Sequence, residues 1–336
     1  MIGNSIDFSL SNVWRCWYKF RRGKKRSNEL ELYSYNLEEN LYSLCLDLQQ
    51  GTYRHGTYRS FFVADNKKRK ISVANIRDRV VHRLLYEYLV PIYDKTFLYD
   101  VWSCRKRKGL LGAIERSQKF LCSYKAGFVW RGDVTKFFDS VDCTTLIDIL
   151  KKRISDPRAQ ALLWKVIASG AASTRERERE RERERRSPAL KTGIPIGNLT
   201  SQVFANIYLN EFDRFVVCIL KPKGYVRYGD DFIIIQESEK ALAEHRQLAK
   251  KFLKEKLKLY INPKQNIVAP IKYGIHFLGT HIFPTGRRLN KRNKRRVHER
   301  LTLKNVSSYN GLVQKHAKSE RVKEFYWQVL RRLEEI

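Results

Sequence analysis

The chain has 336 residues, and 43% of them are hydrophobic, which is enough for a sizeable core divided among two or three subdomains. Lys and Arg total 67 against 35 Asp and Glu, so the formal net charge is +32, which favours a polyanionic partner: nucleic acid first, an anionic membrane surface second. No run of 18 apolar residues and no basic-then-apolar N-terminal pattern occurs, so neither membrane insertion nor secretion is indicated.

The spacing of cysteine and histidine argues against a zinc site and against a secreted disulfide framework. No two cysteines form a CxxC pair, no histidine lies beside them at zinc-finger spacing, and the seven histidines form no HExxH. We therefore expect buried free thiols in a reducing cytosol, and so a cytoplasmic protein. The six cysteines are Cys16, Cys45, Cys104, Cys122, Cys143 and Cys218.

The N-terminal part of the chain is predicted to be helical around one pair of strands. Residues 58–64 and 67–74 have the composition of two strands joined by a charged turn. Across residues 77–93 apolar side chains recur at helical spacing, and the helix is expected to end near Pro91. Residues 127–138 then predict a strand, a short turn and a helix.

A helical stretch at 144–168 is followed by an unusual charged tract. Residues 175–186 comprise seven Arg and five Glu in almost strict alternation. In a helix this puts like charges four residues apart, and in a strand it leaves nothing to bury. We therefore expect a disordered, solvated insertion over residues 173–190. Contact of its arginines with RNA is the alternative.

Two adjacent carboxylates lie in the segment YVRYGDDFIIIQ, residues 225–236, between two runs of strand-forming residues. A β-hairpin with a polar tip would explain the turn, but Asp230 and Asp231 repel each other, and a divalent cation would relieve that repulsion. Asp133 ends another predicted strand, FVWRGD. If the two strand ends are neighbours in one sheet, three carboxylates converge and predict a site for Mg²⁺.

The rest of the chain alternates short strands with helices. Residues 191–216 predict a turn followed by a helix that Thr200 or Ser201 can cap. Residues 240–259 predict an amphipathic helix, 261–270 a turn and a strand, and 274–283 a pair of strands. Eight Lys and Arg residues and one acid fall between residues 287 and 300, ahead of a C-terminal helix.

Five segments in chain order resemble the motifs of reverse transcriptases, of the bacterial, group II intron-like kind. FVWRGDVTKFFDSVD looks like motif A, GIPIGNLTSQVFANIYL like motif B, RYGDDFIII like motif C, LKLYINPKQ like motif D and HFLGTHI like motif E. KKRKISVANIRDRVVH is similar to the family's fingers segment. The likeness covers residues 55–285. It implies an RNA-directed DNA polymerase that copies a template RNA into cDNA by two-metal phosphoryl transfer.

The resemblance also implies an α+β right-hand polymerase fold with fingers, a palm containing an antiparallel sheet, and a helical thumb. On this basis residues 1–125 are expected to form the fingers, with 145–195 contributing and including the insertion at 173–190. Residues 126–285 would form the palm with motifs A to E, and 286–336 the basic thumb.

Individual roles follow from the same resemblance. Asp133, Asp230 and Asp231, with the backbone carbonyl of Val134, would hold two Mg²⁺ ions, and Lys264 would protonate the departing pyrophosphate, unless it is an ordinary surface lysine. Close backbone approach to the nascent base pair is the role implied for Gly197. The residues implied to bind the incoming triphosphate are Lys67, Arg69 and Arg77, for which a solvated charged turn is the alternative.

Phe138 is the residue expected to select the sugar. RNA polymerases of the viral kind have a carboxylate five positions after the motif A aspartate, where it accepts a hydrogen bond from the ribose 2′-OH. This chain has Phe138 there, and Asp139 comes one position too late. An aromatic ring would exclude a 2′-OH, so the resemblance favours deoxynucleotides and a DNA product. Ordinary core packing is the alternative for this ring.

Motif B departs from the pattern of most reverse transcriptases, which have glutamine before its glycine and proline after its serine. Here Ile196 precedes Gly197, and Gln202 follows Ser201. That pattern resembles the reverse transcriptases of diversity-generating retroelements, whose family role is error-prone copying of a template RNA. An isoleucine cannot donate a hydrogen bond to nucleotide or template, which predicts loose base selection.

The expected partners are template RNA, a primer with its cDNA, dNTPs and a small basic accessory protein, with no membrane. Three alternatives remain: a retron-like or phage-defence reverse transcriptase, an RNA-dependent RNA polymerase, and a non-catalytic RNA-binding protein on a degenerate polymerase fold. The neighbouring genes would distinguish the first alternative, and an incorporation assay that offers dNTPs against rNTPs would distinguish the second. The third predicts that Asp231→Ala leaves both RNA affinity and function intact.

Overall fold

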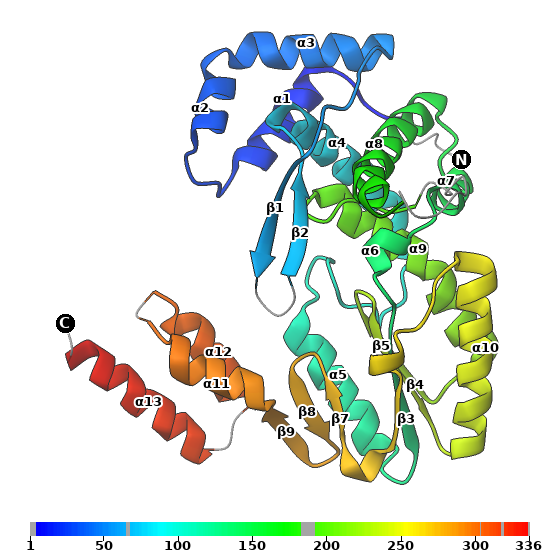
Figure 1. The fold of residues 1–336 in the computed structure, drawn as a ribbon, viewed down its shortest axis with the longest axis vertical. Coiled ribbons are helices and arrows are strands. Elements are labelled where there is room, and N and C mark those ends of the chain that lie inside the picture. The colour runs from blue at the N-terminus through cyan, green and yellow to red at the C-terminus, as the bar shows by residue number, and fades with distance from the viewer. Residues whose placement is uncertain (1–4, 65–67, 183–191, 303, 317–318, 335–336) are drawn as a thin grey trace. The chain divides into compact units, whose positions relative to one another are not determined.

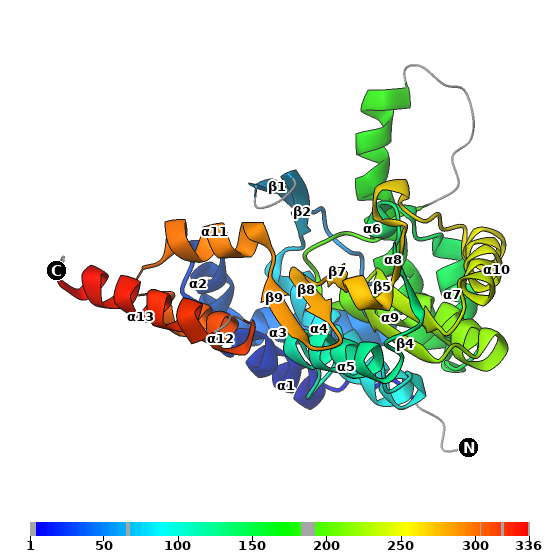
Figure 2. The same ribbon diagram turned by 90° about the horizontal axis from the view of Figure 1, so that it is seen from below.

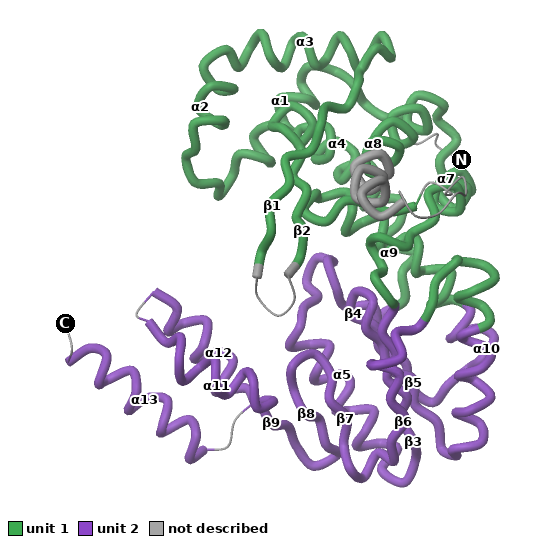
Figure 3. Tube along the Cα trace, viewed as in Figure 1, with its two compact units in different colours: residues 1–98, 135–214, 251–260 green, residues 99–134, 215–250, 261–336 purple. Residues whose placement is uncertain are grey.

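The computed structural model describes residues 5–64, 68–182, 192–302, 304–316 and 319–334. The chain divides into two compact units, shown in different colours in Figure 3. Unit 1 comprises residues 1–98, 135–214 and 251–260, and unit 2 comprises residues 99–134, 215–250 and 261–336. These units cut across the subdomains expected from sequence, because residues 286–336 share a unit with the strand that ends at Asp133. The fingers, palm and thumb boundaries remain a prediction.

Unit 1 is mostly helical. Helices α1, α2, α4 and α7 begin at side-chain caps, where Ser9, Ser27, Asn75 and Asp142 each accept a hydrogen bond from a backbone N–H three residues on. Helices α1 and α9 both pack against α4. The elements are α1 (Leu10–Arg21), α2 (Asn28–Tyr35), α3 (Leu37–Gln50), α4 (Ile76–Tyr93), the 3₁₀ turn η1 (Asp94–Thr96), α6 (Phe137–Ser140), α7 (Cys143–Lys151), α8 (Pro157–Glu182) and α9 (Leu199–Arg214).

The two predicted strands of unit 1 are confirmed as an antiparallel pair. Strands β1 (Arg59–Ala64) and β2 (Lys68–Val73) pair from Arg59 opposite Val73 to Ala64 opposite Lys68. As a two-stranded ribbon the pair leaves side chains exposed on both faces, and Phe61 and Phe62 are exposed.

The Arg-Glu tract differs from the prediction of a disordered insertion. Helix α8 continues through Glu182, so the backbone of 173–182 is helical, while residues 183–191 lie outside the described residues. Arg and Glu are both good helix formers, and strict alternation places opposite charges three residues apart. A helix already nucleated at Pro157 can therefore extend into the tract at little cost.

Unit 2 is built on a four-stranded antiparallel sheet in the order β4-β5-β3-β6. Helix α5 packs against β4, β5 and the hairpin strand β8 (Thr280–Phe283), as Figures 1 and 2 show. Val129, Val226, Ile233 and Ile235 project from the sheet into this fully buried core. The strands and helix are β3 (Phe128–Asp133), β4 (Gly224–Tyr228), β5 (Asp231–Gln236), β6 (Ile267–Pro270) and α5 (Leu110–Ser123).

A second sheet and helices α10 to α13 complete the described part of unit 2. Strand β9 contacts α11 and α12, and Leu289, Val297, Leu301, Val313 and Phe325 form a small core there. Helix α10 (Glu239–Leu257) runs from unit 2 into residues assigned to unit 1. The remaining elements are the π-helical turn η2 (Phe215–Leu220), η3 (Pro263–Gln265), η4 (Ile271–Tyr273), β7 (Ile275–Phe277), β8 (Thr280–Phe283), β9 (Gly286–Leu289), α11 (Lys291–Arg300), α12 (Val306–His316) and α13 (Ser319–Glu334).

Two expectations about the chain's surroundings can be compared with the structure. All six cysteines are free thiols, as expected from their spacing, but the expectation that they are buried is wrong for Cys104, Cys122 and Cys218, which are exposed. Among the described residues, no helix combines the length and the apolar character needed to cross a bilayer.

Candidate active site

The carboxylates predicted to converge lie at the paired ends of two neighbouring strands in unit 2. Strands β3 and β5 are antiparallel, and their register places Asp133 directly opposite Asp231. The backbone N–H of Val134 donates to the carbonyl of Asp230 over 3.3 Å. The prediction that the two strand ends are neighbours in one sheet is therefore confirmed.

The turn that carries Asp230 is held by buried neighbours. Gly229 has φ of +67°, a left-handed conformation that suits glycine. The guanidinium of Arg227, whose side chain is fully buried, donates to the Gly229 carbonyl over 2.9 Å. On β3, a Cβ at Gly132 would lie 2.4 Å from the ring of Phe232, so only glycine fits beside Asp133.

Asp133 and Asp231 each have a polar partner that the sequence analysis missed. Asn262 donates from its side-chain amide to Oδ2 of Asp133 over 3.1 Å, and from its backbone N–H to the Asp133 carbonyl over 2.7 Å. Arg131 makes a two-pronged pair with Asp231, at 2.9 Å from Nε and 2.8 Å from Nη2. Because side chains alternate along a strand, Arg131 shares a face with Asp133, and that alternation was the available signal.

Burial dominates the electrostatics of Asp231. The pKa of this carboxyl is raised to about 6, chiefly because burial leaves the charged form poorly solvated, and the charge of Asp133 contributes in the same direction. Arg131 acts in the opposite direction but does not outweigh burial.

The donor set suits a hard divalent cation, but it is not arranged as a ready metal cage. Carboxylate oxygens are the ligands that Mg²⁺ prefers. Within the described part of the chain, however, no three His, Cys, Asp or Glu side chains are grouped closely enough to hold a metal. The residues thus fit the ion chemically, but the carboxylates would have to rearrange to bind it. Arg131 opposes this rearrangement because it occupies both oxygens of Asp231.

Two further predicted residues lie in the same unit. Val134 is buried and forms an isolated antiparallel bridge with Ile261, so its backbone is fixed beside the carboxylates. Lys264 is exposed in η3, and its backbone N–H donates to Oδ1 of Asn262, the residue that holds Asp133. The roles of Val134 as a metal ligand and Lys264 as a proton donor remain predictions.

The segment resembling motif B lies in unit 1 and is fastened to the end of β2. The N–H of Ser72 donates to the Ile196 carbonyl over 2.8 Å, and the Asn198 amide donates to the Ser72 carbonyl over 2.9 Å. Gly197 has φ of +120°, and a Cβ there would lie 2.8 Å from a methyl group of Ile71. Glycine is therefore required by both conformation and space.

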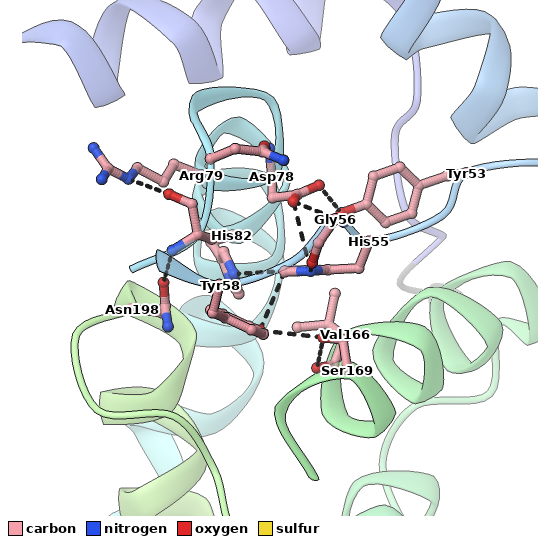
Figure 4. Close-up of polar contacts among 12 residues, drawn as sticks. Tyr53, His55, Gly56, Tyr58, Asp78, Arg79, His82, Val166, Ser169 and Asn198 are labelled. Atoms are coloured by element: carbon pink, nitrogen blue, oxygen red, sulfur yellow. Dashed lines mark hydrogen bonds and ion pairs between the residues drawn. The ribbon is translucent and has the colours of Figure 1, made fainter. Parts of the chain in front are cut away.

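A buried polar network supports the start of α9 (Figure 4). Nδ1 of His82 lies 2.7 Å from the hydroxyl of Thr200, and its Nε2 lies 3.2 Å from Nε2 of His55. Asp78 accepts from the Tyr53 hydroxyl over 2.7 Å and from the Gly56 N–H over 2.9 Å. Burial lowers the pKa of His82 to about 3, so this imidazole is neutral at physiological pH.

The start of α9 differs from the sequence prediction that Thr200 or Ser201 caps the helix. The helix begins at Leu199, so both residues lie inside its first turn. Thr200 instead faces His82, and the hydroxyl of Ser201 donates to the Pro195 carbonyl over 2.6 Å. Tertiary hydrogen bonds have replaced the local cap.

A basic cavity of about 530 Å³ opens beside Gly197 and Gln202. Lys24 and Arg79 lie in its lining, and burial together with the charge of Arg79 lowers the pKa of Lys24. Crowded cations of this kind favour a bound anion. The lining residues are Lys19, Phe20, Arg22, Lys24, Val73, Arg79, His82, Arg83, Gly197, Asn198, Leu199 and Gln202.

The other predicted nucleotide contacts in unit 1 vary in accessibility. Arg69 is exposed on β2, and Lys67 lies outside the described residues. Arg77 forms an ion pair with Asp47, which a phosphate would have to displace. Phe138 is half-buried in α6 with its ring 5.3 Å from that of Phe137, and its carbonyl accepts from the Ile194 N–H. Their roles remain predictions.

Comparison with known proteins gives the family. The profile of the family described as reverse transcriptase (RNA-dependent DNA polymerase) matches residues 63–282, which is more than half of the chain. Protein YkfC of Escherichia coli K12 is 27% identical over 270 residues, covering 69% of this chain and 68% of YkfC.

Two further proteins are similar over smaller shares of their own length. The group II intron-encoded protein LtrA of Lactococcus lactis is 24% identical over 185 residues, covering 54% of this chain and 28% of LtrA. A structure of telomerase from Candida albicans with a fragment of telomeric RNA aligns with a TM-score of 0.48 and 12% identity, over 72% of this chain and 48% of that one. The mixed helical architecture with its antiparallel sheets is the right-hand polymerase fold, and the chain belongs to the reverse transcriptase family of RNA-directed DNA polymerases.

Proposed function

We propose that this chain copies a template RNA into cDNA by extending a primer with dNTPs, using divalent cations held at the ends of β3 and β5. The observation that carries the proposal is the register that sets Asp133 opposite Asp231, with Asp230 in the adjoining turn. The match over residues 63–282 supports the same activity, because all five segments quoted above overlap the matched range.

The residues of the site divide the work of nucleotidyl transfer. Asp133, Asp230 and Asp231, with the carbonyl of Val134, would hold two Mg²⁺ ions. When bound, such ions activate a primer 3′-hydroxyl and stabilise the leaving pyrophosphate. Asn262 orients Asp133 by its amide. Lys264 would donate a proton to the pyrophosphate, with its backbone fixed by Asn262.

Unit 1 would bind the nucleotide and the template. Lys67, Arg69 and Arg77 are proposed to hold the triphosphate, and Phe138 to exclude the 2′-OH of a ribonucleotide. The cavity beside Gly197 and Gln202 is lined by five Lys and Arg side chains, which suits the phosphates of a nucleic-acid strand. The net charge of +32 supports the same partner.

At a finer level we propose error-prone copying of the kind found in diversity-generating retroelements. Ile196 carries this proposal, because its side chain has no hydrogen-bonding group while its carbonyl is engaged by Ser72. A small basic accessory protein and a cytoplasmic location belong to the same proposal. The similarity to the intron-encoded protein LtrA favours a group II intron-type alternative. If Ile196 causes error-prone copying, Ile196→Gln should lower the misincorporation rate opposite template adenines. An unchanged rate would favour the alternative.

The activity is tested by incorporation of labelled dNTPs on a primed RNA, with and without Mg²⁺. We expect extension with dNTPs and not with rNTPs, and Phe138→Ala should admit rNTPs. Asp230→Asn should abolish extension, whereas Asp139→Asn, the neighbouring carboxylate outside the site, should retain it. Extension by the Asp230→Asn variant at the wild-type rate would refute the proposal.

A further inference from the structure

Arg131 contacts Asp231, one of the three carboxylates of the site, but has no role in the proposed nucleotidyl transfer. It precedes Asp133 by two residues on β3 and therefore points to the same face of the sheet. In the β3–β5 register Arg131 stands opposite Ile233, so Asp231 is its diagonal neighbour. The two side chains are only 16% and 15% exposed, which keeps most water away from the pair.

Three nitrogens of the guanidinium are engaged at once. Nε and Nη2 donate to Oδ1 and Oδ2 of Asp231, and Nη1 donates to the backbone carbonyl of His276 on β7 over 2.8 Å. This planar fork is the strongest geometry available to an Arg–carboxylate pair. The contact with His276 also keeps the guanidinium in place if Asp231 moves away from it.

The pair has a direct consequence for cation binding. Both oxygens of Asp231 already accept hydrogen bonds, and the positive charge of Arg131 stands where a metal ion would need negative charge. A cation can use Asp231 only if that pair opens. Asp133 is engaged differently, because its partner Asn262 is neutral.

Building on the proposed function, we propose that Arg131 is a positioning residue that competes with the divalent cation for Asp231. In the free protein the cation is held by Asp133 and Asp230, and Asp231 joins only when Arg131 releases it. The site is then weakly metal-loaded until substrate phosphates arrive with their own cation and negative charge. A purely structural Arg131 would change stability when replaced, but would leave cation affinity unaltered.

The same unit offers a matched control. Arg116 holds Asp100 with the same two-pronged geometry, at 2.8 Å from Nε and 2.9 Å from Nη2. This pair contains none of the three carboxylates of the site. Arg116→Gln therefore removes one positive charge and one Arg–Asp fork, as Arg131→Gln does, without touching the cation site.

The test is Mn²⁺ binding to the full chain without nucleotide or nucleic acid. Binding is measured as the decrease in the electron paramagnetic resonance signal of free Mn²⁺. Arg131→Gln should tighten binding about tenfold, a coupling of ordinary size between two ligands that exclude each other. Arg116→Gln should bind as wild type. Adding Asp231→Asn to Arg131→Gln should abolish the gain, because Asp231 is the ligand that was freed.

Arg131→Lys covers the case in which the glutamine variant does not fold, as judged by circular dichroism. Lysine keeps the charge but lacks the fork, so it leaves one Asp231 oxygen available and should tighten binding about threefold. Unchanged or weaker Mn²⁺ binding by whichever variant folds would overturn the competition. If Asp133→Asn does not weaken binding by the wild-type chain, the proposed cation site itself is wrong, and that failure is separate from the role of Arg131.

Discussion

Two regions carry the proposed chemistry, and they are built in opposite ways. The carboxylate end of β3 and β5 in unit 2 is placed by backbone pairing, with a few partly exposed side-chain contacts at Asp133 and Asp231. The loop around Gly197 in unit 1 is placed by buried side chains, from Asn198 to the neutral His82. Substitutions should therefore affect chiefly activity in the first region and chiefly stability in the second.

Asp78→Ala is expected to have the largest effect on folding. It leaves the buried Tyr53 hydroxyl and the Gly56 N–H without their acceptor, and each unsatisfied group costs about 1–3 kcal/mol, so we expect a loss of about 3 kcal/mol. Denaturant unfolding measures it. Asp47→Ala removes a more exposed carboxylate of the same unit and should cost less than about 1 kcal/mol. Equal losses for the two variants would contradict the contrast between the regions.

Asn262→Ala tests the carboxylate region, where a substitution should affect activity more than stability. The side chain orients Asp133 from a partly exposed position, so its removal should cost about 1 kcal/mol of stability or less. Misplacement of a metal-binding carboxylate should still lower kcat about tenfold or more. Primer-extension kinetics and unfolding curves for the same preparation measure both quantities. A variant that loses stability but keeps kcat would show that Asn262 is structural only.

Lys24→Gln tests the basic cavity of unit 1. If Lys24 contacts a phosphate, RNA affinity should fall, and the slope of log affinity against log salt concentration should decrease by about 0.7. Lys165→Gln, a lysine of the same unit that donates to the Gly51 carbonyl outside the cavity, is the control. Identical slopes for wild type and Lys24→Gln would show that Lys24 and its cavity do not contact the phosphates of the bound RNA.

The pH dependence of cation binding should follow Asp231. Because burial raises the pKa of its carboxyl to about 6, the group is largely neutral at pH 5 and ionised at pH 7. In the wild-type chain Arg131 holds both oxygens of Asp231, so the profile is measured with Arg131→Gln, in which Asp231 can bind the cation. Mn²⁺ affinity of this variant should rise with pH as Asp231 ionises, and adding Asp231→Asn should flatten that rise. In the wild-type chain the same shift means that the carboxyl favours the folded state at low pH, an advantage lost as pH rises through its folded-state pKa. A flat profile for Arg131→Gln would contradict the role of Asp231.

The sequence predicted those parts of the site that depend on local pattern and strand pairing. Two runs of strand-forming residues and the turn at Gly229 indicated the hairpin of β4 and β5, and Asp133 at the end of FVWRGD indicated its neighbour. What it missed depends on contacts between segments far apart in the chain. The distance from Arg131 to Asp231 is decided by sheet register, and the His55–His82 contact by the packing of the segment before β1 on α4.

The Arg-Glu tract and Thr200 were missed for a different reason. In each case a local rule, like-charge spacing or a cap residue, was overridden by neighbouring structure: a helix already formed at Pro157, or the imidazole of His82. The family-based roles of Phe138, Ile196 and Gln202 remain predictions, because they concern contacts with nucleotide and template.

The central claim is that Asp133 and Asp230, far apart in the chain, serve one cation site. The most direct test is the kcat of primer extension for Asp133→Asn, Asp230→Asn and the double variant. If both residues serve one site, each single substitution should lower kcat by at least about 10³-fold, and the double variant should lose little more. Losses that multiply in the double variant, or near-normal kcat for Asp133→Asn, would contradict the account.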